Sequence, residues 1–234
     1  MLPANTSHAA SPTDAARPAA GSVAGVGTDV ETWMSWSREL HSIAQAGLTY
    51  AQNPFDLARY ERLRDLTADL TAALADGPPE PLRAAFAAET GYLTPKLDVR
   101  AAVTDDAGRL LMVREIADGR WAMPGGCADV NEGLVTGAVR EVHEESGYVV
   151  EATRLLGLYD KRLWGSPPSP TYTLTAVVAC RLLGGEATPS YETTEVGWFA
   201  RGDLPELSTG RTPLPLLERV FAHLDDPTLP QDLT

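Results

Sequence analysis

A run of glycines, glutamates and one arginine between Gly125 and Gly147 constrains this chain more than any other feature. Three of its glutamates stand at positions i, i+3 and i+4, namely Glu141, Glu144 and Glu145. At about 100° per residue, these positions share one face of an α-helix. Three carboxylates on one face repel each other unless cations lie among them, and hard oxygen ligands favour Mg²⁺ or Mn²⁺. The spacing therefore predicts a helix that carries a metal site beside a cleft.

The residues around this predicted helix fit a supporting role. Gly125 and Gly126 permit tight turns and let a ligand approach the backbone closely. Arg140 can pair with Glu132 and hold the preceding loop against the helix, and Gly147 stands where a left-handed residue commonly ends a helix. An exposed, charge-rich surface helix is the alternative, and the correctly spaced glycines and arginine argue against it. The apolar side of the helix is expected to be buried through Val135, Ala138, Val139 and Val142.

Length and charge limit the classes of function. The chain has 234 residues, enough for one large domain or a domain with an appendage, and a net charge of −13. This negative charge argues against binding to long nucleic acids, because proteins bind them largely through Lys and Arg side chains that contact the phosphates. A polyphosphate substrate is therefore expected to be held by metal ions and a few local cations. The candidate cations are Lys96, Arg100, Lys161 and Arg162.

Cysteine usage and the N-terminal composition bear on localisation. Cys127 and Cys180 have no metal-ligand spacing, which favours a reduced, cytoplasmic protein. No apolar run in the sequence reaches the length of a membrane span. Residues 1–30 are rich in Ala, Ser, Pro, Thr and Gly and lack a basic start followed by an apolar stretch, so a disordered tail is predicted rather than a secretory signal.

Periodicity divides the remaining chain into a helical part, 31–92, and an α/β part, 93–234. Helices are predicted over 32–47, from a cap at Asp56 onward, and over about 81–89. Their apolar stripes, interpreted as packing surface, contain Trp33, Trp36, Leu40, Ile43, Leu57, Tyr60, Leu63, Leu66 and Leu70. Alternating residues predict strands over 97–104, 109–114, 152–159, 172–182 and 195–200, and a closing helix is predicted over 213–223. This order predicts an α/β/α sandwich with a mixed sheet, preceded by a small all-α domain.

The motif Gly126-x5-Glu132-x7-Arg140-Glu141-x2-Glu144-Glu145-x-Gly147 resembles the signature of the Nudix diphosphate hydrolases at every fixed position. Tyr148 stands where a bulky aliphatic residue is usual, and the resemblance extends over about residues 94–205. The segments that begin at Trp33, Ala46 and Asn53 resemble the small helical domain of one Nudix subgroup. That subgroup hydrolyses nucleoside diphosphates linked to a moiety X, and includes enzymes acting on CDP-choline and ADP-ribose.

The resemblance implies a reaction and roles for named residues. Two or more Mg²⁺ ions held by Glu141, Glu144 and Glu145 would neutralise the phosphates and lower the pKa of a water that attacks one phosphorus. Glu141 and Glu145 are the first candidates for direct ligands, and Glu132 is assigned a structural role. The general base is either one of the motif glutamates or Glu192. The residues expected to meet the substrate are Gly126, Arg100, Lys161 and Arg162.

Two departures from the subgroup leave the substrate open. Cys127 stands where a tryptophan is common, and residues 163–169 replace a histidine-rich stretch. Removal of pyrophosphate from RNA 5′ ends is the alternative enzyme activity, and a metabolite sensor without turnover or a scaffold are the alternatives from other classes. The apolar helical stripes are expected to pack on the α/β part of the chain, on a second subunit or on both, and a homodimer whose interface includes the N-terminal helices is favoured.

Overall fold

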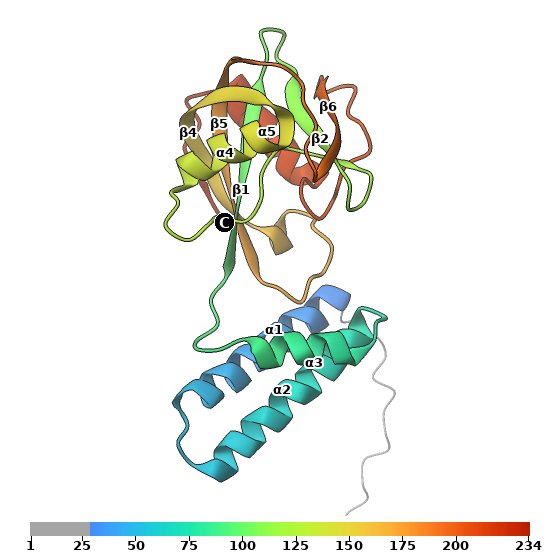
Figure 1. The fold of residues 1–234 in the computed structure, drawn as a ribbon, viewed down its shortest axis with the longest axis vertical. Helices are drawn as coiled ribbons and strands as arrows, with labels where there is room; N and C mark the ends of the chain where they lie inside the picture. The colour runs from blue at the N-terminus through green and yellow to red at the C-terminus, as the bar shows by residue number, and fades with distance from the viewer. Residues whose placement is uncertain (1–28) are drawn as a thin grey trace, which may run out of the picture.

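The computed structural model describes residues 29–234, and Figure 1 shows their arrangement. The predicted tail, residues 1–30, lies outside the described residues except for its last two. Of these, Val30 is already helical, because the Asp29 carboxylate caps the first helix by accepting the Thr32 N–H at 2.8 Å.

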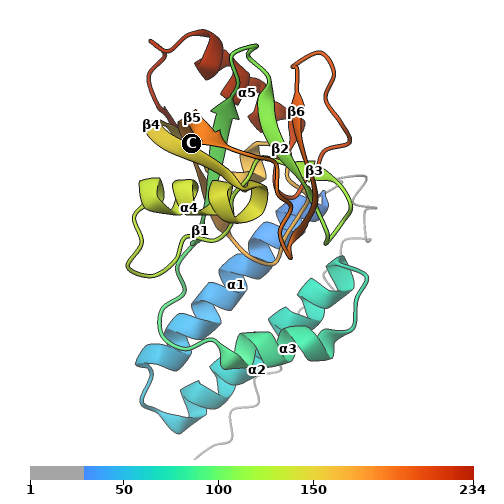
Figure 2. The ribbon, with the colours of Figure 1, turned by 45° about the horizontal axis from the view of Figure 1, so that its top comes forward.

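In the part of the chain that the structure describes, three helices precede the first strand: α1 (Val30–Tyr50), α2 (Pro54–Leu74) and α3 (Pro79–Ala88). The cap of α2 is Asn53, whose side chain accepts the Phe55 N–H, and Asp56 lies within the first turn instead. Pro54 accounts for this earlier start, since a proline at the first helical position lacks only an N–H that has no partner there. Figures 1 and 2 show the three helices as a separate layer at one end of the sheet.

The face on which α1 and α2 pack differs from the predicted stripes. Small side chains are buried there, among them Ser37, Ala44, Ala68, Thr71 and Ala72. Four of the predicted stripe residues are exposed: Trp33 by 41%, Trp36 by 47%, Ile43 by 49% and Leu66 by 46%. The other five are partly buried: Leu40, Leu57, Tyr60, Leu63 and Leu70. Small residues let two helix backbones approach closely, and Met34 is a large side chain of α1 that is buried with them.

The strands form one mixed, seven-stranded sheet within residues 29–234, in the order β3-β2-β1-β5-β4-β7, with β6 paired to β2. β1 pairs in parallel with β5 and β4 with β7, and the other pairs are antiparallel. The bounds are β1 Lys96–Thr104, β2 Leu110–Glu115, β3 Trp121–Ala122, β4 Tyr148–Asp160, β5 Thr173–Gly185, β6 Thr193–Phe199 and β7 Asp232–Leu233. A short 3-10 helix, η1, covers Lys161–Leu163.

Two helices cover the two faces of this sheet: α4 (Leu134–Ser146) and α5 (Leu214–Asp225). Ala138 and Val142 of α4 share a core with Val99 and Leu111, whereas α5 packs on the opposite face. The predicted α/β/α sandwich with a mixed sheet and a preceding helical part is confirmed. Val135 is an exception to the predicted buried side of α4, because it is 59% exposed in the first turn.

Both faces of β1 are buried, contrary to the simple alternation of the sequence. Val99 and Ala101 face α4, while Asp98 and Arg100 lie on the other face and are only 7% and 4% exposed. Two buried charged side chains in the central strand mark this face as a polar region. No helix of the described residues is both long and apolar enough to cross a membrane.

Candidate active site

The glutamates of α4 lie in two different environments. Glu141 and Glu145 are 8% and 4% exposed, whereas the Glu144 side chain is half exposed. Arg140 organises the cluster, because its guanidinium donates to Glu132 at 2.9–3.3 Å and to Glu144 at 2.8 Å, and lies 3.0 Å from Glu141. The loop before α4 is thereby tied to the helix by charge-assisted hydrogen bonds.

The two glycines before Cys127 bring the backbone against these carboxylates. The Gly125 N–H donates to Glu145 Oε2 at 2.9 Å, and Gly125 has φ 146°, a conformation that favours glycine. A Cβ at Gly126 would lie 2.8 Å from Glu141 Oε1. Gly147 ends α4 with φ 75° and donates its N–H to the His143 carbonyl. The site therefore depends on close backbone approach at one end of the helix and on a left-handed cap at the other.

Burial raises the pKa of both inner glutamates. The pKa of Glu145 rises to about 7, chiefly because the carboxylate is removed from water, although the Gly125 N–H and Arg100 oppose this. The charge of Glu141 raises the pKa of Glu145 further, and the pKa of Glu141 is itself raised by burial. Two buried, like-charged carboxylates are costly unless a cation neutralises them.

The carboxylate oxygens of the three motif glutamates are suitable ligands for a hard divalent cation. They are not yet oriented toward one common ion position. Within residues 29–234, no three His, Cys, Asp or Glu side chains already converge as ligands of one ion. Glu141 and Glu145 present buried carboxylates whose pKa values a cation would lower, because it removes the penalty of burial and repulsion. Glu144 is turned toward Arg140 and would have to leave that ion pair to join them.

Glu192 lies in the turn before β6, and this turn contacts the end of α4. The Thr193 hydroxyl donates to the Glu145 carbonyl oxygen at 2.9 Å, and the Ile116 N–H donates to the Glu192 carbonyl. The Glu192 side chain is exposed, while the negative charges of Glu192, Glu144 and Glu141 all raise the pKa of neighbouring Tyr191. The structure thus brings Glu192 to the rim of the glutamate cluster.

The predicted cationic side chains differ in their distance from the glutamates and in their ion pairs. Arg100 lies nearest the glutamates, because its side chain packs against Gly125 and its charge opposes the raised pKa of Glu145. Lys161 and Arg162 are each paired with a carboxylate, Lys161 with Asp98 and Arg162 with Asp160, both at 2.5 Å. Lys96 is exposed and lies 3.6 Å from Glu89 at the start of β1.

Sequence reasoning missed a second buried pair beside the site. Glu115, the last residue of β2, is 5% exposed and lies 3.2 Å from Arg211 Nε. Its charge raises the pKa of Glu145, and Arg211 and Arg100 oppose the raised pKa of Glu115 itself. The available signal was a charged residue ending an otherwise apolar strand, but its partner lies in a distant loop without any motif.

Cys127 does not have the properties of a nucleophile. Partial burial and the nearby Asp98 carboxylate raise the pKa of its thiol, so the thiol stays protonated at neutral pH. Its Sγ lies 3.7 Å from Asp98 Oδ1, where residues 98 and 127 form an isolated β-bridge. Cys127 therefore joins the glycine loop to β1.

Two family models match the chain. Residues 94–219 match the NUDIX domain, and residues 31–86 match the "UDP-X-like, N-terminal oligomerisation domain". A Bacillus subtilis (strain 168) protein provisionally named an ADP-ribose pyrophosphatase is 34% identical over 195 residues, which cover 83% of this chain and 93% of that protein. An ADP-ribose pyrophosphatase of Methanocaldococcus jannaschii is 29% identical over 50% of this chain and 69% of its own.

Solved structures of Nudix enzymes are also similar to this chain. The crystal structure of a UDP-X diphosphatase is 27% identical with a TM-score of 0.56, covering 88% of this chain and 99% of its own. An ADP-ribose pyrophosphatase from Streptococcus suis is 35% identical with a TM-score of 0.55, covering 60% of this chain and all of its own. This chain therefore belongs to the Nudix hydrolases, in the subgroup that carries a UDP-X-like N-terminal domain.

Proposed function

We propose that this Nudix hydrolase cleaves the pyrophosphate bond of a nucleoside diphosphate linked to a moiety X, in a reaction that requires Mg²⁺ or Mn²⁺. The observation that carries the proposal is the buried pair Glu141 and Glu145, whose pKa values are raised beside the glycine loop. The products are a nucleoside monophosphate and X-phosphate. ADP-ribose and UDP-X compounds are the first candidate substrates, in line with the relatives, and CDP-choline is a further candidate.

Each residue has a role in this proposal. Glu141 and Glu145 hold the cation, with Glu144 joining them, and the cation supplies neutralisation of phosphate charge and acidification of a water. Arg140 and Glu132 fix the loop, and Gly126, which has no Cβ, lets the loop backbone lie close to Glu141 and contributes a backbone contact to the phosphates. Arg100 offers a positive charge beside Gly125. The general base is a carboxylate at the cluster, either a motif glutamate or Glu192 at its rim.

Hydrolysis at RNA 5′ ends is the alternative enzyme activity, and the charge distribution favours the small substrate. Lys161 and Arg162 are each held by an aspartate, so the rim near η1 offers little free positive charge to a nucleic acid backbone. A metabolite sensor without turnover is disfavoured, because all three motif glutamates are present.

The assembly and location are proposed on separate grounds. Exposed Trp33, Trp36 and Ile43 on α1 support a homodimer through the helical part, which matches a family model described as an oligomerisation domain. The breaks in periodicity and the two family matches support domains over 31–92 and 93–234. Two free cysteines support a reduced, cytoplasmic location.

A substrate screen tests the proposed reaction. The intact protein is incubated with Mg²⁺ and a panel of nucleoside diphosphate derivatives, including ADP-ribose, UDP-glucose and CDP-choline, and the products are separated by chromatography. Turnover is expected for at least one compound, and EDTA should abolish it. Glu145→Gln should lower kcat at least about tenfold, because it removes a ligand of the cation. Glu218→Gln, in a surface pair on α5, is the matched control.

Full turnover in metal-free buffer, or full activity of the Glu145→Gln variant, would refute the metal mechanism. Exclusive action on RNA that carries a 5′-triphosphate, with release of pyrophosphate, would favour the alternative enzyme activity.

A further inference from the structure

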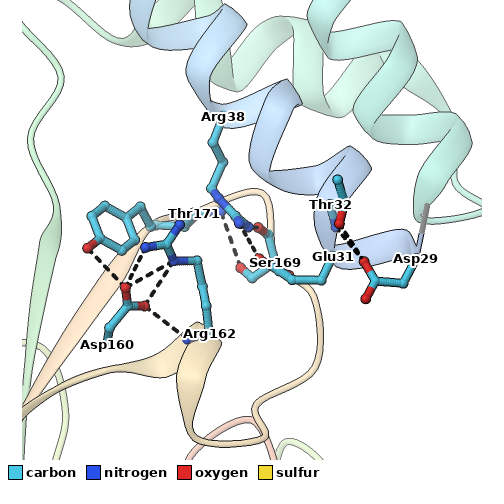
Figure 3. Close-up of polar contacts among 9 residues, drawn as sticks. Asp29, Glu31, Thr32, Arg38, Asp160, Arg162, Ser169 and Thr171 are labelled. Atoms are coloured by element: carbon cyan, nitrogen blue, oxygen red, sulfur yellow. Dashed lines mark hydrogen bonds and ion pairs between the residues drawn. The ribbon is translucent and has the colours of Figure 1, made fainter. Parts of the chain in front are cut away.

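A cavity of about 310 Å³ lies where α1 meets the segment between η1 and β5. Glu31 and Arg38 of α1 form one wall, and Lys161, Arg162 and residues 166–171 form the other. Thr173 and Gly210 complete it. Figure 3 shows Arg38 reaching from α1 toward Ser169, with Arg162 and Asp160 beside them. The helical part of the chain thus supplies side chains to a cavity otherwise lined by the Nudix domain.

Arg38 makes the direct contact between the two parts. Its Nη1 donates to the Ser169 carbonyl oxygen at 2.5 Å, and its Nη2 pairs with Glu31 on the same helix. The Arg38 side chain is only 10% exposed, so its position is set by this contact. An arginine fixed in this way can present its remaining donors to a ligand at low entropic cost.

Contacts also tie the cavity to the glutamate cluster. Lys161, in the cavity wall, pairs with Asp98, and Asp98 lies against Cys127. Cys127 follows Gly126, whose backbone abuts Glu141. Arg100 is two residues beyond Asp98 on the same face of β1, about 6.6 Å further along the strand. The cavity wall is therefore connected to the glycine loop through Lys161, Asp98 and Cys127.

The charges of the cavity balance. Each of its three cations is paired with one carboxylate: Arg38 with Glu31, Lys161 with Asp98 and Arg162 with Asp160. None of the described residues that line it is aromatic. A quaternary ammonium group is recognised by aromatic faces, and an anion needs unpaired positive charge. The cavity therefore lacks the features that would select choline or an additional acidic group.

The hydrogen-bonding groups favour hydroxyls instead. Pro167, Pro168 and Pro170 have no N–H, so this wall offers carbonyl acceptors, and the prolines restrict its backbone. Thr171 and Thr173, which also line the cavity, carry hydroxyl groups. Arg38 has further guanidinium N–H donors besides those that it gives to Ser169 and Glu31. A sugar hydroxyl can accept from such a donor and donate to the carbonyl oxygens of the wall.

We propose that this cavity is the subsite for X, that X is a neutral, hydroxyl-rich sugar, and that α1 completes the subsite through Arg38. The inference rests on the proposed hydrolysis of X-linked nucleoside diphosphates. It gives the helical part a role in substrate recognition in addition to assembly.

The test uses two substrates that share one nucleotide, CDP-glucose and CDP-choline, with the intact protein and Mg²⁺. The wild-type protein is expected to have the higher kcat/KM for CDP-glucose. Arg38→Ala should raise KM for CDP-glucose about fivefold, since one hydrogen bond to the sugar is lost, and should leave KM for CDP-choline unchanged. Arg83→Ala, which breaks a pair with Asp69 between α2 and α3, is the matched control.

Titration calorimetry with ribose 5-phosphate and phosphocholine gives a readout that does not depend on turnover. Tighter binding of ribose 5-phosphate, weakened in Arg38→Ala and unchanged in Arg83→Ala, would support the subsite. Equal binding by all variants, or a preference for phosphocholine, would overturn it. Absence of hydrolysis with binding retained would instead refute the proposed reaction alone. Circular dichroism spectra of Arg38→Ala and Arg83→Ala that match the wild type would show that a change in KM does not come from unfolding.

Discussion

Glu145 carries a buried carboxylate whose pKa of about 7 lies well above its ordinary value of 4.5. In the unfolded chain this group ionises near 4.5, so between about pH 4.5 and 7 the folded protein holds more protons than the unfolded one. Metal-free stability should therefore fall as pH rises through this window, by about 3 kcal/mol in total. Metal binding should remove this loss, because the cation stabilises the ionised carboxylate.

Urea unfolding in EDTA at pH 5, 6, 7 and 8 measures this dependence. Glu145→Gln should flatten the fall in the free energy of unfolding and stabilise the metal-free protein at pH 8. Glu144→Gln, at a half-exposed side chain, should keep the slope of the wild type. Parallel pH profiles for wild type and Glu145→Gln would contradict the assigned burial.

Sequence reasoning works best at this scale when the spacing is local. The pairing of Arg140 with Glu132 and the left-handed Gly147 both follow from positions along one loop and one helix, and both are present. Glu115 and Arg211 could not be paired in advance, because they are distant in sequence and meet only when β2 and the loop before α5 come together. The burial of Asp98 was missed for the same reason.

At the scale of elements, the glycine loop sets the position of α4's carboxylates. Gly126→Ala would place a Cβ 2.8 Å from Glu141 Oε1, so the carboxylate or the loop must shift. We expect kcat to fall at least about tenfold, because a misplacement of about 1 Å in a catalytic constellation costs roughly a hundredfold. Steady-state kinetics and circular dichroism measure the two effects separately.

Gly133→Ala is the matched control in the same motif. Gly133 caps α4 with φ −80°, and a Cβ there meets no atom within 4 Å. Its kcat should equal that of the wild type. Equal activity of the Gly126→Ala variant would show that close approach to Glu141 is not required.

The elements themselves were predictable in proportion to their length and periodicity. The long strands β1 and β5 and helix α5 were expected close to their observed bounds, because their apolar residues repeat clearly. β3 and β7 contain two residues each and have no periodicity, so only their partners in the folded sheet define them. β4 begins directly after Gly147, earlier than expected, because the sharp end of α4 leaves no loop.

In the whole molecule, the two exposed tryptophans of α1 form an apolar surface that we expect a second subunit to bury. Trp33 and Trp36 contact each other edge to face, with ring centroids 5.0 Å apart. The double variant Trp33→Ser/Trp36→Ser should convert the proposed homodimer to a monomer, since aromatic residues dominate such interfaces. Light scattering measures the mass. Leu183→Ser, at a similarly exposed position on β5, is the control and should stay dimeric.

A monomeric wild type would contradict this assignment, as would a double variant that stays dimeric. The sequence predicted that these side chains need burial but not which surface provides it, because helical periodicity alone does not distinguish packing within a chain from packing between chains.

Metal-dependent cleavage between the two phosphates of an X-linked nucleoside diphosphate can be followed with ADP-ribose and Mg²⁺ in ¹⁸O-labelled water, with mass spectrometry of the products. We expect AMP and ribose 5-phosphate, with ¹⁸O on one of them, and no reaction in EDTA. Release of inorganic phosphate alone, or equal product formation without a divalent cation, would contradict this mechanism.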